Sequence, residues 1–246
     1  MGSYEDNLWT ELLIWQKKMT SAPSFTDRIS KKVQTKINDY IPEKVHKVIT
    51  VTMEKLFKAV LFSAQYTTGK TMADGSLIYR EAYIKSQISF YQKSATVEGA
   101  VTGAGGILMG LADFPVLIGL KIKMLFDIAA RYGFDVSDYR ERLYILYIFQ
   151  LSFSSQQRRN EVFKHISGWD NYARTLPEHA EDFDWRSFQQ EYRDYIDLAK
   201  MAQLLPVIGA AVGAIANYKL VAQLGESAMN CYRLRLLKKA IENRDI

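Results

Sequence analysis

The stretch GGILMGLADFPVLIGL, residues Gly105 to Leu120, decides which kind of fold is open to this chain. It lies within 22 residues, between Glu98 and Lys121, that carry one ionisable side chain, that of Asp113. An apolar helix of about 20 residues spans a bilayer, but a carboxylate halfway along such a span is costly. The stretch is therefore a membrane segment, a buried helical hairpin or the wall of a catalytic pocket.

The tripeptide Asp113-Phe114-Pro115 favours the hairpin. If Asp113 is the N-cap of the helix that follows, its carboxylate accepts the Val116 N–H, and Pro115 has no N–H to leave unsatisfied. The positive end of the helix dipole also favours the aspartate charge at that position. We expect two apolar helical arms joined at this corner, with a catalytic or ligand-binding role for Asp113 as the alternative.

A second apolar run looks like the first. Lys200 and Lys219 enclose 18 residues without a charged side chain, again rich in Gly and Ala and again with a proline, Pro206. Each run contains a G-x-x-x-G spacing, which places two small residues on one helix face and lets a neighbouring backbone approach closely. The glycine pairs are Gly106 with Gly110 and Gly209 with Gly213. We predict that the two runs pack on each other, with chance matches in Gly/Ala-rich helices as the alternative.

Apolar residues recur at helical spacing along almost the whole chain, and strand-like alternation is scarce. The pattern predicts an all-α multi-helix bundle with the two glycine-rich runs packed centrally. We expect one domain over residues 1–246, with basic N-terminal helices in 1–70 and a core in 76–246 that holds both runs.

Individual helices are also visible in the pattern. The first is marked by an apolar stripe at Leu8, Leu12, Trp15 and Met19. A third helix is expected from Pro42 to about Gln65, and a long helix from Leu77. The helix that starts at Pro115 should end at Gly133 in a left-handed cap, before Asp135 or Ser137 caps the next helix.

Basic side chains gather near the N-terminus. The chain has 32 basic and 27 acidic residues, a net charge of +5, and residues 28–58 hold eight basic and three acidic ones. A basic amphipathic helix of this kind can lie on an anionic lipid leaflet. The candidates for membrane contact are Phe25, Arg28, Ile29, Lys31, Lys32 and Lys36. The alternative is that the apolar stripe of this helix faces the core.

The clearest enzymatic signal is Gly69-Lys70-Thr71 within AQYTTGKT, which satisfies a relaxed phosphate-binding pattern. Such a loop needs a strand before it and a second acidic motif after it, and neither is recognisable. We therefore predict an ordinary loop, with nucleotide binding as the alternative.

Other reactive side chains favour structural roles. The three histidines stand at no metal-ligand spacing, so we expect no metal site and no cofactor. The single cysteine, Cys231, excludes an internal disulfide and favours a reducing compartment; without a neighbouring base it is interpreted as a buried thiol. Lys123, Asp127 and Arg131 stand four residues apart, which favours a solvated helix face.

Two longer segments, GGILMGLADFPVLIGLKIKMLFDIAARYGFD and LPVIGAAVGAIANYKLVAQLGESAMNCYRLR, resemble the EcsC protein family, and the resemblance extends over most of the chain. The residues that carry it are Gly105, Gly106, Leu111, Asp113, Pro115, Tyr132, Gly133, Leu205, Pro206 and Gly209. Members of that family resemble a bacterial protein encoded beside a two-component ABC exporter. The resemblance implies a bacterial, cytoplasm-facing and membrane-related protein, and it supplies no catalytic residue.

These observations favour a non-enzymatic accessory protein, peripheral on the inner face of the cell membrane. It would bind anionic lipid and assist an ABC transporter or another membrane protein. The alternative is an enzyme of unknown reaction that uses Asp113 or the loop at Gly69, Lys70 and Thr71. Nucleic-acid binding ranks third, because no recognisable nucleic-acid module is present.

Overall fold

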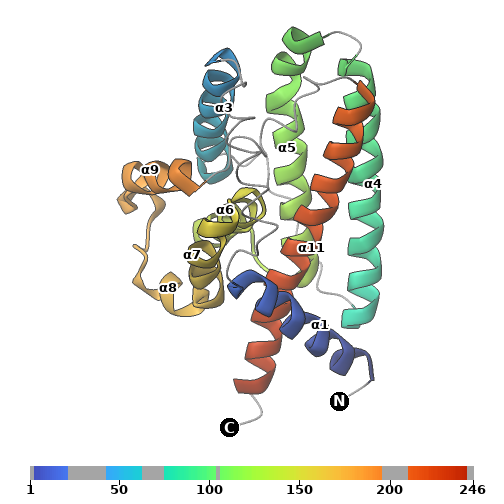
Figure 1. Ribbon diagram of the computed structural model, residues 1–246. Coiled ribbons are helices and arrows are strands. Elements are labelled where there is room, and N and C mark those ends of the chain that lie inside the picture. The colour runs from blue at the N-terminus through green and yellow to red at the C-terminus, as the bar shows by residue number, and fades with distance from the viewer. Residues whose placement is uncertain (1–2, 22–42, 63–74, 104–105, 196–209, 243–246) are drawn as a thin grey trace.

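The computed structural model describes residues 3–21, 43–62, 75–103, 106–195 and 210–242, and every long element in these ranges is an α-helix (Figure 1). The all-α multi-helix fold predicted from the sequence is confirmed. In chain order the elements are α1 (Ser3–Thr20), α3 (Glu43–Phe62), α4 (Leu77–Gly103), α5 (Gly106–Tyr132), α6 (Tyr139–Phe153), α7 (Gln156–Ser167), α8 (Trp169–Thr175), the 3-10 helix η2 (Ala180–Asp182), α9 (Trp185–Tyr195) and α11 (Ala210–Glu242).

The first apolar stripe lies where the sequence predicts it. In α1 all four stripe residues are buried: Leu8, Leu12, Trp15 and Met19. The Trp15 ring packs edge-on against Phe163 of α7, with 5.4 Å between ring centroids. In α3 the apolar stripe is also buried, at Ile49, Met53, Leu56 and Val60. Both helices therefore use their apolar faces for the protein's own core.

Three long helices, α4, α5 and α11, lie side by side (Figure 1). Helix α11 makes its most extensive contacts with α4, and the two run antiparallel. They approach closely at Gly225, where an added Cβ would lie 2.7 Å from Cδ1 of Ile88. Only glycine fits this contact without a shift of the Ile88 side chain, because real Cβ contacts are never so short.

The corner expected at Asp113 is wrong. Helix α5 runs unbroken from Gly106 to Tyr132 with Pro115 inside it, so Asp113 is not an N-cap. Helix α4 instead ends at Gly103 and α5 begins at Gly106, and the two helices run antiparallel (Figure 1). A proline inside a helix removes one backbone hydrogen bond. Pro115 and Val116 are exposed, so the break lies on the solvent side, where water can satisfy the freed carbonyl.

Helix α5 ends as predicted, but the next helix has a different cap. Gly133 has φ of 91°, the left-handed conformation that glycine adopts at helix ends. The N-cap of α6 is Asp138, whose carboxylate accepts the Arg140 N–H at 2.9 Å. Asp135 instead accepts the Ser137 N–H in the preceding turn. Helix α6 is buried almost all round, which is typical of a central core helix.

Candidate functional site

Two arginines near the end of α11 each form an ion pair inside the protein. Arg233 and Arg235 are two positions apart, so their side chains leave the helix about 200° apart. Arg233 points toward α4 and α1, and Arg235 points toward α6. Each meets a buried glutamate, and α11 therefore separates two ion pairs.

The first pair joins Arg233 to Glu81 of α4. Arg233 donates from Nε to Glu81 Oε1 at 2.8 Å and from Nη2 to Oε2 at 2.6 Å, a bidentate arrangement. Two tyrosines donate to the same carboxylate, Tyr132 at 3.0 Å and Tyr4 at 2.8 Å. We call these residues the Glu81 cluster.

Hydrogen bonding keeps Glu81 ionised although it is fully buried. Burial alone would raise the pKa of this carboxyl group, but the hydrogen bonds and charge of Arg233, with the two tyrosines, hold it below the usual range. Burial and the hydrogen bond to Glu81 raise the pKa of Tyr4 to about 12, so this tyrosine remains a donor. The cluster is a charge-assisted network linking α1, α4, α5 and α11.

The second pair joins Arg235 to Glu141 of α6. Arg235 Nη1 donates to Glu141 Oε2 at 2.7 Å, and the Tyr232 hydroxyl donates to Oε1 at 2.8 Å. The guanidinium also lies 4.0 Å from the Phe134 ring centroid and 4.6 Å from that of Tyr144. Burial raises the pKa of Glu141, despite the opposing charge of Arg235.

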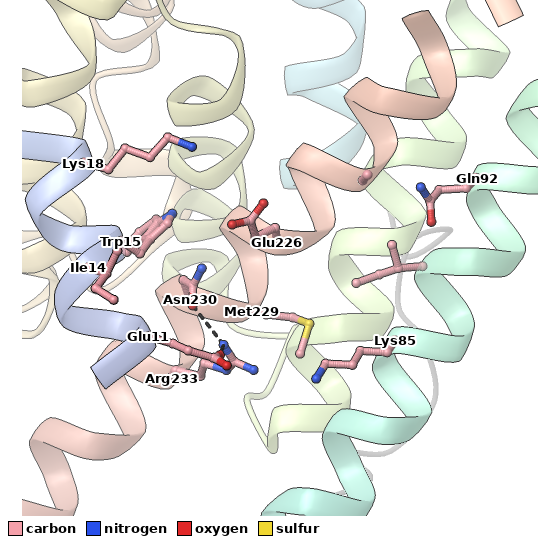
Figure 2. A pocket seen from close by; sticks show the side chains of 12 residues that line it. Glu11, Ile14, Trp15, Lys18, Lys85, Gln92, Glu226, Met229, Asn230 and Arg233 are labelled. Carbon is pink, nitrogen blue, oxygen red and sulfur yellow. Dashed lines mark hydrogen bonds and ion pairs between the residues drawn. The ribbon is translucent and has the colours of Figure 1, made fainter. Parts of the chain in front are cut away.

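An open groove of about 580 Å³ lies between α1 and α4, with α11 as its floor (Figure 2). Its lining is mostly apolar, with Trp15, Ile88 and Met229 among the contributors. Ile14, which is 66% exposed, also lines it.

The charged groups of the groove lie on different helices. Figure 2 shows Lys18 on α1, Lys85 on α4 and Glu226 on α11 between them. Arg233 also lines the groove and donates to the exposed Glu11 at 3.3 Å. Arg233 is paired with the buried Glu81, so the two lysines of the lining stand against two carboxylates, Glu11 and Glu226. An elongated apolar ligand whose anionic end lies beside Lys18 or Lys85 matches these features.

The structure describes few of the candidate membrane and nucleotide residues. Outside the described residues lie Phe25, Arg28, Ile29, Lys31, Lys32, Lys36, Gly69, Lys70, Thr71, Gly105, Leu205, Pro206 and Gly209. Membrane contact through the basic helix and the loop interpretation of Gly69 to Thr71 therefore stay predictions. Packing of the two glycine-rich runs on each other also stays a prediction, although α11 contacts both α4 and α5.

Among the described motif residues, Tyr132 and Gly133 belong to the site, and Asp113 and Pro115 do not. Tyr132 donates to Glu81, and Gly133 ends the helix just after it. Asp113 and Pro115 lie about five turns earlier in α5. Gly106 begins that helix. The structure therefore places Tyr132 in the Glu81 cluster with Gly133 next to it, and leaves Asp113 and Pro115 far along the helix.

Two expectations about reactive and charged side chains have different outcomes. Cys231 is buried as predicted, and burial raises the pKa of its thiol. The solvated face expected for Lys123, Asp127 and Arg131 is wrong. Asp127 binds both Lys123 and the Tyr91 hydroxyl of α4, each at 2.6 Å, and Arg131 lies 3.8 Å from the Tyr83 ring centroid. Asp127 and Arg131 therefore join α5 to α4, and Lys123 pairs with Asp127 within α5.

Within the described ranges, no group of three His, Cys, Asp or Glu side chains is arranged to hold a metal ion. No helix in those same ranges is long and apolar enough to cross a bilayer.

The four charged residues of the two ion pairs were not singled out from the sequence. Glu81 stands in register with Leu77, Ile84 and Ile88, so it is a charge on an apolar stripe. That position is the signal that identifies it as a buried charge needing a partner. Its partner lies 152 residues away, and no local pattern points to it.

Comparisons with known proteins agree on one relationship. The EcsC protein family matches residues 6–237. Protein EcsC of Bacillus subtilis (strain 168) is 46% identical over 233 residues, which cover 94% of this chain and 96% of that protein. The uncharacterized protein YdbA of the same strain is 32% identical over 153 residues, 62% of this chain and 56% of that protein. No solved structure matches.

Proposed function

This chain belongs to the EcsC protein family, and on that premise we propose that it is a non-enzymatic, membrane-peripheral accessory protein. It assists an ABC-type exporter or another membrane partner from the inner face of the cell membrane, and it does so by binding anionic lipid. The groove between α1 and α4 is the observation that supports lipid binding.

The groove combines the two properties that lipid binding needs. Trp15, Ile88 and Met229 supply an apolar lining for acyl chains, and each buried methylene contributes about 0.8 kcal/mol. Lys18 and Lys85 supply charge for an anionic headgroup, at about 1 kcal/mol for each cation near an anionic surface. Ile14 extends the apolar surface outward, where it would meet the lipid first.

Cosedimentation with phosphatidylglycerol vesicles tests this proposal. The combined Lys18→Glu and Lys85→Glu variant should pellet less than wild type. The matched control combines Lys17→Glu and Lys93→Glu, exposed lysines on the same two helices that do not line the groove. Both variants change the net charge by the same amount. No pelleting of wild type rejects lipid binding, and equal losses in both variants reject the groove as the binding surface.

The basic segment from Arg28 to Lys36 is tested in the same assay. We expect Lys31→Glu, Lys32→Glu and Lys36→Glu together to weaken pelleting. Binding should also fall as salt rises from about 0.1 M to 1 M, because screening shortens from about 10 Å to 3 Å. Unchanged pelleting of the triple variant would exclude this segment as a membrane contact.

The partner is tested separately from the lipid. A photo-crosslinking residue at position 14, at the groove, should join the protein to the membrane subunit of an ABC exporter in bacterial cells. The same residue at position 186, an exposed arginine of α9, is the control. Equal yields at both positions, or lipid-only products at position 14, would count against an exporter partner at the groove.

A further inference from the structure

A second hollow, separate from the groove, lies where the start of α6, the helix α8 and the end of α11 meet. Its volume is about 380 Å³. Four cationic side chains line it, and three carboxylates accompany them. The cations are Arg140, Arg174, Arg235 and Lys238, and the carboxylates are Asp138, Glu141 and Asp170.

Two of the three carboxylates are already engaged within the protein. Asp138 caps α6 through the Arg140 N–H, and Glu141 accepts from Arg235 and Tyr232. Asp170 is 41% exposed, with its Oδ1 at 3.9 Å from Arg235 Nε. With four cations and three carboxylates, the lining of the hollow has one positive charge in excess.

Arg235 contributes a buried donor to this hollow. Its side chain is 10% exposed, and its Nε is buried without a hydrogen-bond partner among the described residues. Buried polar groups are nearly always hydrogen-bonded, and Asp170 Oδ1 at 3.9 Å is beyond hydrogen-bond distance, so this donor can take a further acceptor oxygen. The same guanidinium is held rigidly by Glu141 and by the Phe134 and Tyr144 rings. A fixed donor of this kind favours recognition of an oxyanion.

The two more accessible cations complete the arrangement. Lys238 Nζ donates to the Ser167 carbonyl, which positions the ammonium group and leaves it two further N–H donors. Arg174 is exposed at the end of α8 and makes no ion pair with a described residue. Arginine matches the geometry of phosphate oxygens with paired donors, and lysine adds a point charge.

We propose that this hollow binds a phosphate group, with Arg174, Lys238 and Arg235 as its donors. A phosphate group is common to anionic lipid headgroups and to soluble phosphate esters, and either source has the required chemistry. The site is distinct from the groove and does not depend on the proposed membrane function.

Calorimetric titration with glycerol phosphate tests the soluble source. Arg174→Glu should weaken binding about tenfold or more, because a charged hydrogen bond is replaced by repulsion. Arg186→Glu is the control, since it makes the same charge change at an exposed arginine outside the hollow. Asp170→Asn should tighten binding, because it removes the exposed carboxylate beside Arg235.

Cosedimentation with phosphatidylglycerol and phosphatidylcholine vesicles tests the lipid source with the same variants. A selective loss for Arg174→Glu with vesicles alone identifies a headgroup site, and a selective loss with glycerol phosphate identifies a soluble ester. Equal responses of Arg174→Glu and Arg186→Glu in both assays, or no binding of either probe by wild type, would overturn the proposal. Binding of glycerol phosphate without vesicle pelleting would leave this site standing and reject the membrane function.

Discussion

On one face of α11, Glu81 accepts two hydrogen bonds from Arg233 and one from each of two tyrosines. On the other face, Glu141 accepts one hydrogen bond from Arg235 and one from Tyr232. Both carboxylates are buried, yet the pKa of Glu81 is lowered and that of Glu141 is raised. Burial raises the pKa of both groups; at Glu81 the hydrogen bonds and charge of Arg233, with the two tyrosines, outweigh it, whereas at Glu141 one arginine and one tyrosine do not.

The opposite pKa shifts of Glu81 and Glu141 indicate which ion pair contributes more to the stability of the fold. The Glu81 cluster ties together four helices through an ionised carboxylate, so the loss of that charge leaves the buried Arg233 with the exposed Glu11 as its remaining ion-pair partner among the described residues. Arg235 has a second set of contacts in the Phe134 and Tyr144 rings, which remain if Glu141 is neutralised. Neutralising the glutamate should therefore lower the free energy of unfolding more on the Glu81 face of α11 than on the Glu141 face.

Glu81→Gln should have the largest effect, a loss of about 3–5 kcal/mol in the free energy of unfolding, because it removes the buried counterion of Arg233 and leaves only the exposed Glu11. Urea denaturation followed by circular dichroism measures it. The control is Glu11→Gln, which alters a partner of the same arginine that is 64% exposed and should cost less than about 1 kcal/mol. Similar costs for both variants would show that the buried pair has no special weight.

Glu141→Gln should be less costly, about 1–2 kcal/mol by the same denaturation assay. Burial already disfavours the ionised carboxylate, and the amide oxygen of glutamine can still accept a hydrogen bond from Arg235. A loss of unfolding free energy equal to that of Glu81→Gln would contradict the expected difference between the two ion pairs.

Gly225→Ala tests how tightly the Glu81 face of α11 is packed. Overpacking against Ile88 costs about 1–3 kcal/mol, and the gain in helix propensity returns about 1 kcal/mol. We expect a net loss of about 1 kcal/mol, measured by thermal and urea unfolding. Adding Ile88→Ala removes the clash, so the double variant should cost less than the sum of the single ones. If the free-energy costs of the two substitutions are additive, the methyl group added at position 225 does not clash with Ile88.

The pH dependence of stability should differ in sign between the faces. Because the folded pKa of Glu81 is lowered, its contribution is present above the unfolded value of about 4.3 and is lost as pH falls through the folded pKa. Because the folded pKa of Glu141 is raised, its contribution is present below about 4.3 and is lost as pH rises through the folded pKa.

Urea midpoints measured from about pH 3 to 8 distinguish these contributions. Glu81→Gln should flatten the acid side of the profile, and Glu141→Gln should remove a decline above about pH 4.3. Profiles parallel to that of wild type would show that neither carboxylate changes its pKa on folding.

Helices whose periodicity is local were predictable from the sequence. The α1 stripe at Leu8, Leu12 and Trp15 is buried, and Gly133 has the expected left-handed conformation, because both depend on neighbouring residues. The prediction of a corner at Asp113 was wrong because it also relied only on neighbouring residues. A local rule about proline was applied where the helix continues with Pro115 on its exposed side.

The candidate site was predictable only in part, because it is built from distant segments. Tyr132 was identified within the family motif, but its partner Glu81 lies 51 residues away. Arg235 and Glu141 are 94 residues apart, and neither ion pair leaves a repeating local signal. A charge on an apolar stripe, as at Glu81, indicates that a partner exists but not which residue it is.

The ion pair between Glu11 and Arg233 also constrains how the protein is made, because its residues are 222 positions apart. A chain synthesised at about 5–20 residues per second releases α1 on the order of 10 s or more before α11. Throughout that interval the side of α1 that packs on α11 stays uncovered, and the final closure is a contact of very high sequence separation. The newly made chain is therefore most prone to aggregate just before its last helix is complete.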